Sequence, residues 1–146
     1  MTNDDLHYQL SIALLRASMK GKYAMTALAE AHGITLQQAM TLCLLELGNG
    51  VRMSTIANYL TCDPSTITGV VERLVTLGFI DRKESKTDRR QKLISLTASG
   101  RDLRNELLKV VTETRFPALA SLDTNDIHEF IRLINKATDG AGLPVE

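Results

Sequence analysis

Short hydroxyl side chains gather on one side of a segment that has the apolar spacing of a helix. The segment runs from Asp63 to Gly78, and its apolar residues recur at i, i+3, i+4 and i+7: Ile67, Val70, Val71 and Leu74. The opposite side carries small polar residues and one arginine: Ser65, Thr68, Gly69, Arg73 and Thr76. A surface helix usually presents lysine and glutamate there. Short donors and acceptors favour a helix that reads base edges in a DNA groove.

The residues at both ends of this segment are typical of helix boundaries. Asp63 is expected to accept hydrogen bonds from free backbone amides as the N-cap, and Pro64 suits the first helical position. Gly78 suits a left-handed cap at the other end.

A short helix is predicted just upstream, where residues 56–60 have helical apolar spacing and Ser54 is the expected cap. The linker 61–63 has about the length of the turn in a helix-turn-helix. Taken alone, the two helices fit an ordinary antiparallel helix pair equally well, so the segments that follow decide between the two.

Two alternating segments follow, and a basic loop separates them. Residues 79–84 and 93–97 alternate in the manner of strands, and residues 85–92 between them are polar and charged. The pattern predicts a β-hairpin with a solvated tip, as in the wing of a winged helix. Residues 73–92 hold seven Lys/Arg and three Asp/Glu, a net charge of +4, whereas the whole chain is neutral. A concentrated basic patch beside such a helix indicates phosphate binding.

The order of these motifs resembles the MarR family of transcriptional regulators. The resemblance runs from about residue 35 to residue 103 and rests on six segments: Ser54-Thr-Ile-Ala-Asn-Tyr-Leu60, Asp63-Pro-Ser-Thr-Ile-Thr68, Val71-Glu-Arg-Leu74, Leu77-Gly-Phe-Ile-Asp-Arg82, Asp88-Arg-Arg90 and Leu96-Thr-Ala-Ser-Gly100. The last two are highly specific in combination. The resemblance implies a homodimeric winged helix-turn-helix protein on pseudo-palindromic double-stranded DNA, commonly a repressor released by small phenolic or other anionic ligands.

The expected fold class is therefore mainly α with a small β-hairpin wing, a winged helix-turn-helix flanked by dimerisation helices. Residues 35–97 are expected to form the DNA-binding lobe, and residues 1–34 and 98–138 the dimerisation helices. Residues 139–146 have no pattern and are expected to be a disordered tail. At 146 residues, one structural domain is expected overall.

The first group of expected DNA contacts lies on the helix after Asp63. Ser65, Thr66 and Thr68 are expected to enter the major groove and to contact base edges and adjacent phosphates. Arg73 is expected either to reach a phosphate or to hold the wing through an internal ion pair. Many family members carry a long, often basic side chain where this chain has Gly69, so that base contact cannot be transferred.

The second group of expected contacts lies in the wing. Arg90 matches the arginine that contacts the minor groove in the family, and Asp88 is expected to orient it. A narrow minor groove favours arginine because its negative potential is enhanced. Arg89 and Lys86 are expected to contact phosphates.

Segments outside the lobe are apolar on more than one side, which favours a homodimer. The first helix carries two stripes: Leu6, Leu10, Ala13 and Ala17, then Tyr8, Ile12, Leu15 and Met19. Such a helix needs cover from two directions. Later segments carry one stripe each: Leu103, Leu107, Val110 and Val111, then Ile127, Phe130, Ile131 and Ile134 after a cap at Asp123. A monomeric all-α core is the alternative.

Two helix boundaries outside the hairpin are also predicted. The Thr35-x-x-Gln38 box is expected to open a second helix that ends at Gly48-Asn-Gly50. Pro117 is expected to kink or end the fifth helix.

An effector site is expected from the resemblance alone. In the family, ligands lodge between the dimerisation helices and the DNA-binding lobe. Arg16, Tyr23, His32 and Met40 are candidates for lining such a crevice, although no spacing rule selects them. A surface ion pair is the alternative role for Arg16.

The remaining reactive residues give no pattern of a catalytic or metal site. Cys43 lies on an apolar stripe, Cys62 lies in the helix-turn-helix turn, and three scattered histidines lack metal-ligand spacing. We therefore expect no enzyme, no metal and no cofactor. Two alternatives stay open: a winged-helix module that binds protein, and a redox-responsive regulator that uses Cys62. A protein-docking face would favour exposed aromatic or aliphatic residues, which the 65–76 face lacks.

No run of apolar residues is long enough to span a membrane, and the first residues lack the pattern of a secretory signal. No membrane partner and a cytoplasmic location are therefore expected.

Overall fold

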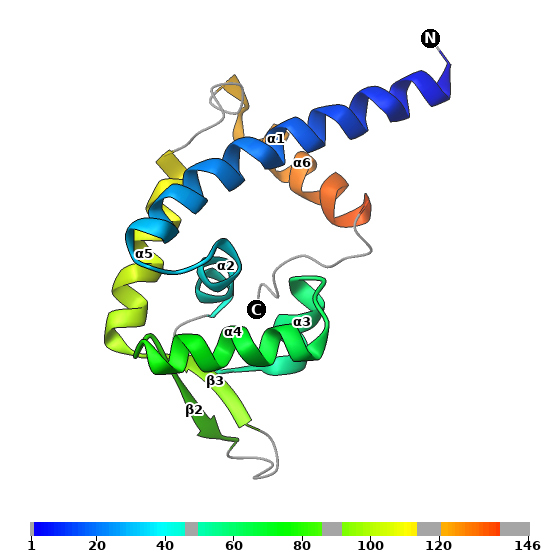
Figure 1. The fold of residues 1–146 in the computed structure, drawn as a ribbon. Coiled ribbons are helices and arrows are strands. Elements are labelled where there is room, and N and C mark those ends of the chain that lie inside the picture. Colours follow the sequence, from blue (N-terminus) through cyan, green and yellow to red (C-terminus); the bar gives the residue numbers. More distant parts are fainter. Residues whose placement is uncertain (1, 46–49, 86–91, 114–120, 138–146) are drawn as a thin grey trace. The chain divides into compact units, whose positions relative to one another are not determined.

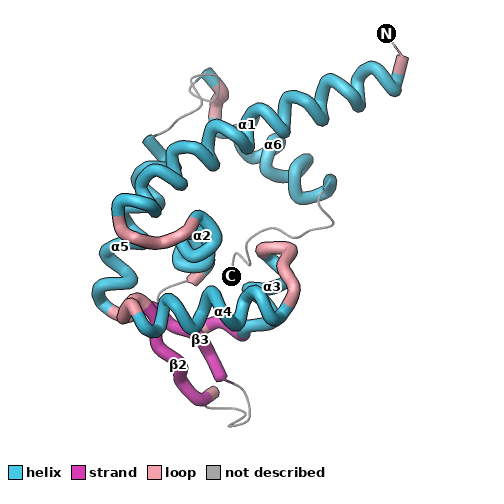
Figure 2. Tube along the Cα trace, in the orientation of Figure 1, coloured by secondary structure: helices cyan, strands magenta, loops and turns pink. Residues whose placement is uncertain are grey.

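The computed structural model describes residues 2–45, 50–85, 92–113 and 121–137. The chain forms two compact units, Met1–Thr114 and Arg115–Glu146. The first unit contains, in order, α1 (Asn3–Ala31), α2 (Leu36–Leu44), β1 (Val51–Arg52), α3 (Met53–Tyr59), α4 (Pro64–Thr76), β2 (Ile80–Glu84), β3 (Lys92–Leu96) and α5 (Ala98–Glu113). The second contains α6 (Thr124–Ala137). Figure 1 traces these elements and Figure 2 colours them by type.

The predicted fold class is confirmed, because the chain is mainly helical with a small antiparallel sheet. Helices α3 and α4 form the helix-turn-helix pair, and β2 pairs with β3 as the base of the wing. Both strands begin and end within one residue of the predicted segments 79–84 and 93–97. The tip of the wing and the tail 139–146 lie outside the described residues.

The sheet has a third strand that the sequence pattern does not predict. β1 pairs antiparallel with β3 in the register Val51 to Ile94 and Arg52 to Leu93, so the strand order is β1-β3-β2. Only two residues belong to β1, too few to show an alternation of apolar and polar residues. Its pairing makes β3 the central strand of the sheet.

The predicted helix caps are confirmed in three places. Thr35 and Gln38 form a capping box at the start of α2, Asp63 caps α4, and the Asp123 side chain accepts from the backbone N–H of Asp126 at 2.9 Å before α6. Gly78 has a φ of +76° after α4, as its predicted left-handed cap requires.

Two predicted helix boundaries are wrong. α3 has Arg52 as its N-cap, without a side-chain hydrogen bond, and Ser54 already lies inside the helix. The reason is β1, since the chain leaves strand pairing at Arg52 and enters the helix at once. α2 ends at Leu44, before the predicted turn at Gly48-Asn-Gly50. The predicted helix end near Pro117 lies outside the described residues.

One hydrophobic core holds the first unit together. α2 packs against α1, α4 and α5, and α4 also packs on β2. All four residues of the apolar stripe of α4 are buried in this core. Its full set of buried apolar side chains is Ala29, Ile34, Ala39, Leu42, Leu45, Ile56, Ala57, Ile67, Val70, Val71, Leu74, Ile80, Ile94, Leu103 and Leu107.

The Leu-Thr-x-x-Gly motif joins the start of α5 to the turn between α4 and β2. The hydroxyls of Thr97 and Ser99 donate to the Gly78 carbonyl at 2.6 and 3.0 Å, and the Gly100 N–H donates to Thr97 Oγ1 at 3.1 Å. A Cβ at Gly100 would lie 1.8 Å from the carbonyl oxygen of Phe79. The motif therefore fixes the position of the wing relative to α5.

The apolar stripes of α1 and α6 are largely exposed in the single chain. Ala29 is the one buried residue of α1 among those described, and α6 has none. In Figure 1 the N-terminal half of α1 extends away from α2 and α5. The exposed large side chains of the two helices are Leu6, Tyr8, Leu10, Ile12, Leu14, Leu15, Met19, Tyr23, Ile127, Phe130, Ile131 and Leu133. Within the described residues, no helix is long and apolar enough to cross a membrane.

Candidate nucleic-acid interface

The Asp63 carboxylate organises the start of α4. Its Oδ1 accepts from the Thr66 backbone N–H at 2.9 Å and from the Ser65 hydroxyl, and its Oδ2 accepts from Thr66 Oγ1 at 2.6 Å. These hydrogen bonds, with the Ser65 hydroxyl the strongest contributor, hold the pKa of Asp63 well below its usual range. Asp63 is therefore ionised at neutral pH, and Ser65 and Thr66 both point their hydroxyl hydrogens at it.

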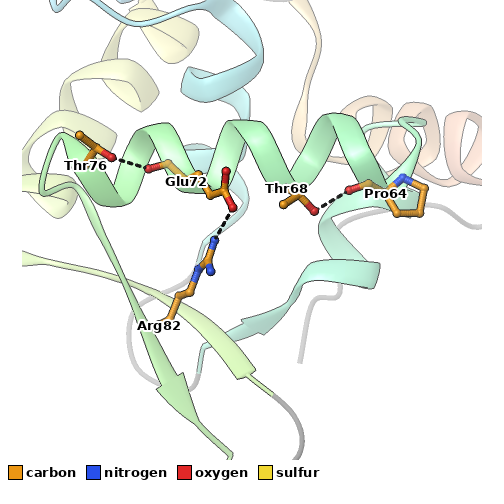
Figure 3. A network of polar contacts seen from close by, with 5 residues as sticks. All are labelled: Pro64, Thr68, Glu72, Thr76 and Arg82. Atoms are coloured by element: carbon orange, nitrogen blue, oxygen red, sulfur yellow. Dashed lines mark hydrogen bonds and ion pairs between the residues drawn. The ribbon is translucent and has the colours of Figure 1, made fainter.

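The outer face of α4 continues with hydroxyls bonded to the backbone of the same helix. Thr68 Oγ1 donates to the carbonyl oxygen of Pro64 and Thr76 Oγ1 to that of Glu72, each at 2.9 Å, as Figure 3 shows. Between them Gly69 is exposed, and a Cβ built there would have no atom within 4 Å. Neighbouring parts of the chain leave this stretch of α4 open.

Glu72, and not Arg73, forms the ion pair that links α4 to the wing. Glu72 Oε1 lies 4.0 Å from Arg82 Nη2 on β2 (Figure 3). Arg82 shares a face of β2 with the buried Ile80, because side chains two residues apart on a strand point to the same side. Arg73 is exposed and pairs with no acid among the described residues. Both expected roles of Arg73, a contact to a phosphate and an internal ion pair that holds the wing, stay predictions.

The base of the wing presents further positive charge. Arg82 and Lys83 on β2 and Lys92 on β3 are exposed, and Asp81 and Glu84 lie among them. The expected wing contacts Lys86, Asp88, Arg89 and Arg90 lie outside the described residues, so their positions are not part of this geometry.

The turn between α3 and α4 is held by a side chain from α2. Gln37 Nε2 donates to Cys62 Sγ at 2.8 Å, and the Cys62 thiol donates to the Leu60 carbonyl at 3.1 Å. Thr61, between them, has a φ of +52°, which is unusual for a β-branched residue. The sequence contains no signal for this conformation. Cys62 is half-buried in a structural contact here.

Cys43 packs against the core, as its place on the apolar stripe predicts. Burial raises the pKa of the Cys43 thiol, and the nearby charge of Arg104 opposes the shift only in part. A thiol with a raised pKa is less reactive, because the thiolate is the nucleophile.

The four candidate effector residues do not form one cluster. Arg16 and Tyr23 are exposed on α1, and Met40 is partly exposed on α2. His32, at the end of α1, lies 3.0 Å from Glu106 Oε2 on α5 through its Nε2. Arg16 and His32 are separated along α1 by about 24 Å at the usual helical rise. Within one chain these two residues therefore lie far apart, and the effector site stays a prediction.

Sequence reasoning missed Arg104, which follows the buried Leu103 on α5. Its Nε atom is buried and has no hydrogen-bond partner among the described residues. A buried donor without a partner is uncommon, because losing water without a replacement hydrogen bond costs free energy. No sequence spacing indicates it, since its burial results from packing between α2 and α5. Within the described ranges, no group of His, Cys, Asp and Glu could hold a metal ion.

Comparisons with known proteins find a matching family model, transcriptional regulators of similar sequence and solved structures of similar fold. The model of the MarR family matches residues 34–92. The transcriptional activatory protein BadR of Rhodopseudomonas palustris is 27% identical over 118 residues, covering 78% of this chain and 67% of BadR. The HTH-type transcriptional regulator MgrA of Staphylococcus aureus is 24% identical over 133 residues, covering 90% of this chain and 89% of MgrA. The crystal structure of CouR from Rhodococcus jostii RHA1 bound to p-coumaroyl-CoA has the same fold, with a TM-score of 0.77 at 24% identity, covering 88% of this chain and 90% of CouR.

Proposed function

We propose that the chain is a DNA-binding transcriptional regulator of the MarR family, and that it acts as a homodimeric repressor on a pseudo-palindromic operator. The observation that carries the proposal is the open hydroxyl face of α4 beside a basic hairpin. Short polar side chains on α4 would fit the major groove, and the exposed basic residues of β2 and β3 would contact the duplex backbone.

The proposed contacts divide between base edges and the phosphate backbone. Ser65, Thr66 and Thr68 lie on the outer face of α4 and would contact base edges. Arg73 would contact a phosphate, because its neighbour Glu72 occupies the internal ion pair with Arg82. In the wing, Arg90 would enter the minor groove with Asp88 beside it, and Lys86 and Arg89 would contact phosphates.

The proposed homodimer would be formed by α1 and α6, with part of α5. The largest exposed apolar side chains on α1 are Tyr23 at 80%, Tyr8 at 69% and Met19 at 62%. Exposed apolar side chains that recur along one helix are typical of an interface. Light scattering on the purified chain should give two chains per particle. Footprinting should show two half-sites about one helical turn apart, roughly 10 base pairs centre to centre.

We propose that the effector is a small anionic molecule. Phenolic compounds are the first to test. Arg104 supports an anion, because its buried Nε lacks an acceptor among the described residues. CouR, similar in fold, is bound to p-coumaroyl-CoA in its crystal structure. Hydroxylated aromatic acids should therefore be screened by thermal shift, with release of DNA as the second readout. Repression is tested with a reporter gene placed under the promoter of the gene that encodes this chain. Expression of the reporter should rise when the gene that encodes the chain is deleted.

Binding to DNA is tested by fluorescence anisotropy with duplexes from the chain's own promoter region, over a range of salt. Arg90→Ala should weaken binding and lower the salt slope by about one phosphate equivalent. Arg132→Ala is the matched control, since Arg132 on α6 is already paired with Glu129 at 2.6 Å. Unchanged affinity of Arg90→Ala at every salt concentration would remove Arg90 from the interface. Failure of the unaltered chain to bind any such duplex at low ionic strength would contradict the proposed function.

A further inference from the structure

The hydroxyls at the start of α4 donate their hydrogen bonds to acceptors within the protein. Ser65 and Thr66 donate to the Asp63 carboxylate, and Thr68 donates to the carbonyl of Pro64. A hydroxyl has one hydrogen to donate and two lone pairs that accept. An ionised carboxylate and a backbone carbonyl can only accept, so the direction of these three hydrogen bonds is not ambiguous. Toward solvent, each hydroxyl therefore offers lone pairs and no hydrogen.

Asp63 keeps this arrangement in place. The hydrogen bonds that it accepts hold its pKa well below the usual range, so it stays ionised at neutral pH. Hydrogen bonds to an ionised group are roughly twice as strong as those between neutral groups. Turning the hydroxyl of Ser65 or Thr66 outward would give up such a bond. The carboxylate also places a negative charge beside these hydroxyls, which disfavours a phosphate next to them.

The surface beside the three hydroxyls allows a base edge to come close. Gly69 follows Ser65 by four residues and therefore lies on the same face, one turn along the helix. A Cβ at Gly69 would have no atom within 4 Å from the described residues beyond its immediate chain neighbours, so those residues leave this space open. Thr66 and Thr68 also carry methyl groups, which can contact the methyl group of thymine.

We infer that Ser65, Thr66 and Thr68 act on DNA as hydrogen-bond acceptors, and that they read the exocyclic amino groups of adenine and cytosine in the major groove. In that groove adenine N6 and cytosine N4 are the donors, whereas guanine N7 and O6, thymine O4 and the phosphates all accept. The inference rests on the proposed function and sharpens it. It also removes the phosphate contacts that the sequence suggests for these three residues.

The test begins with selection of duplexes from a randomised library by the full-length chain. In the selected half-site, each adenine is then replaced by purine nucleoside, which lacks the amino group, and each cytosine by a pyrimidinone nucleoside, which also lacks it. Guanines are replaced by deazaguanine, which lacks N7. Loss of single amino groups at the centre of the half-site should weaken binding about five- to tenfold. Deazaguanine replacements at the guanines of the same half-site should have little effect.

Variants assign the amino groups to residues. Thr68→Val keeps the shape of the side chain but removes the acceptor. In that variant, deleting the amino group that Thr68 contacts should not weaken DNA binding any further. Thr68→Ser keeps the acceptor and should restore the sensitivity. Asp63→Asn still caps the helix but accepts through one oxygen only, which releases a hydroxyl hydrogen. It should make guanine tolerated opposite Ser65 or Thr66 and leave the position opposite Thr68 unchanged.

The outcomes separate this inference from the proposed function. Sequence-specific binding that depends on guanine N7 or O6 opposite these residues, or on phosphate oxygens shown by methylphosphonate replacement, would overturn the inference and leave the proposed function intact. Equal sensitivity to amino deletion in Thr68→Val and in the unaltered chain would remove Thr68 from the reading face. Enrichment of no duplex at all would overturn both.

Discussion

Helices α4 and α6 carry apolar stripes of the same spacing, yet the two stripes have opposite surroundings. In α4 the four residues Ile67, Val70, Val71 and Leu74 are all buried. In α6 the stripe is Ile127, Phe130, Ile131 and Ile134, and its first three members are 43%, 41% and 51% exposed. The spacing predicts that a helix has an apolar face. It does not tell whether the same chain covers that face.

The difference lies in what the rest of the sequence supplies. α4 is covered by α2, α3 and β2, so its apolar stripe is buried within the first unit. α1 and α6 leave long apolar faces exposed in the single chain. We therefore expect the core of the first unit to be stable without a second chain, and we expect the exposed faces of α1 and α6 to depend on the proposed second chain.

The largest expected effect comes from placing one charge in each stripe. Val71→Glu would bury an unpaired carboxylate in the core and should cost about 4 kcal/mol or more, enough to abolish cooperative unfolding. Ile131→Glu occupies the equivalent position of α6 and should keep the helical circular dichroism while weakening the dimer about 100-fold. Sedimentation and urea unfolding measure the two effects. A dimer of unchanged strength in Ile131→Glu would show that α6 needs no second chain.

A smaller loss is expected where the start of α5 is joined to the turn between α4 and β2. Gly100→Ala would place a Cβ 1.8 Å from the Phe79 carbonyl oxygen and should destabilise the chain by about 3 kcal/mol. Backbone blocks the space, so a side-chain rotation cannot relieve the contact. Urea unfolding gives the loss, and Ser99→Ala, which removes one hydrogen bond to Gly78, should cost only about 1 kcal/mol. Equal losses in the two variants would contradict the steric explanation.

A pair of glycines, one on α4 and one on α1, separates an effect on helix stability from an effect on DNA binding. Neither Gly69 on α4 nor Gly21 on α1 would place a Cβ within 4 Å of another atom. Gly69→Ala and Gly21→Ala should each stabilise the chain by about 1 kcal/mol, because glycine is a poor helix former. Only Gly69→Ala should weaken specific DNA binding, measured by anisotropy on the selected duplex. Equal affinity in both variants would mean that DNA does not approach α4 at Gly69.

The smallest expected effect concerns the pH dependence of Asp63→Asn. The pKa of Asp63 is lowered in the folded chain, so its carboxylate stabilises the fold above the usual pKa of an aspartate, and this contribution is lost as pH falls through and below that value. The unaltered chain should therefore be more stable than Asp63→Asn at pH 7, and the difference should shrink below about pH 4. Urea unfolding between pH 7 and pH 3 measures it. A difference that grows in acid would reverse the assigned role of Asp63.

Local features of this chain could be predicted from the sequence because the contacts that form them join residues only a few positions apart. The Thr35 box, the Asp63 and Asp123 caps and the left-handed Gly78 each depend on contacts at most a few residues away. The alternation of residues 79–84 and 93–97 likewise predicts the two strands of the wing to within one residue.

Features that join distant segments were decided only by the tertiary structure. β1 exists because Val51 and Arg52 meet β3 some forty positions later, and that pairing moved the start of α3 away from Ser54. The ion pair of Glu72 with Arg82 and the buried Nε of Arg104 depend on how α4 lies on the sheet and α5 on α2. Spacing along the chain records which side of an element is apolar. Which partner faces that side is set by packing, because a contact between distant segments leaves no periodic trace in either one.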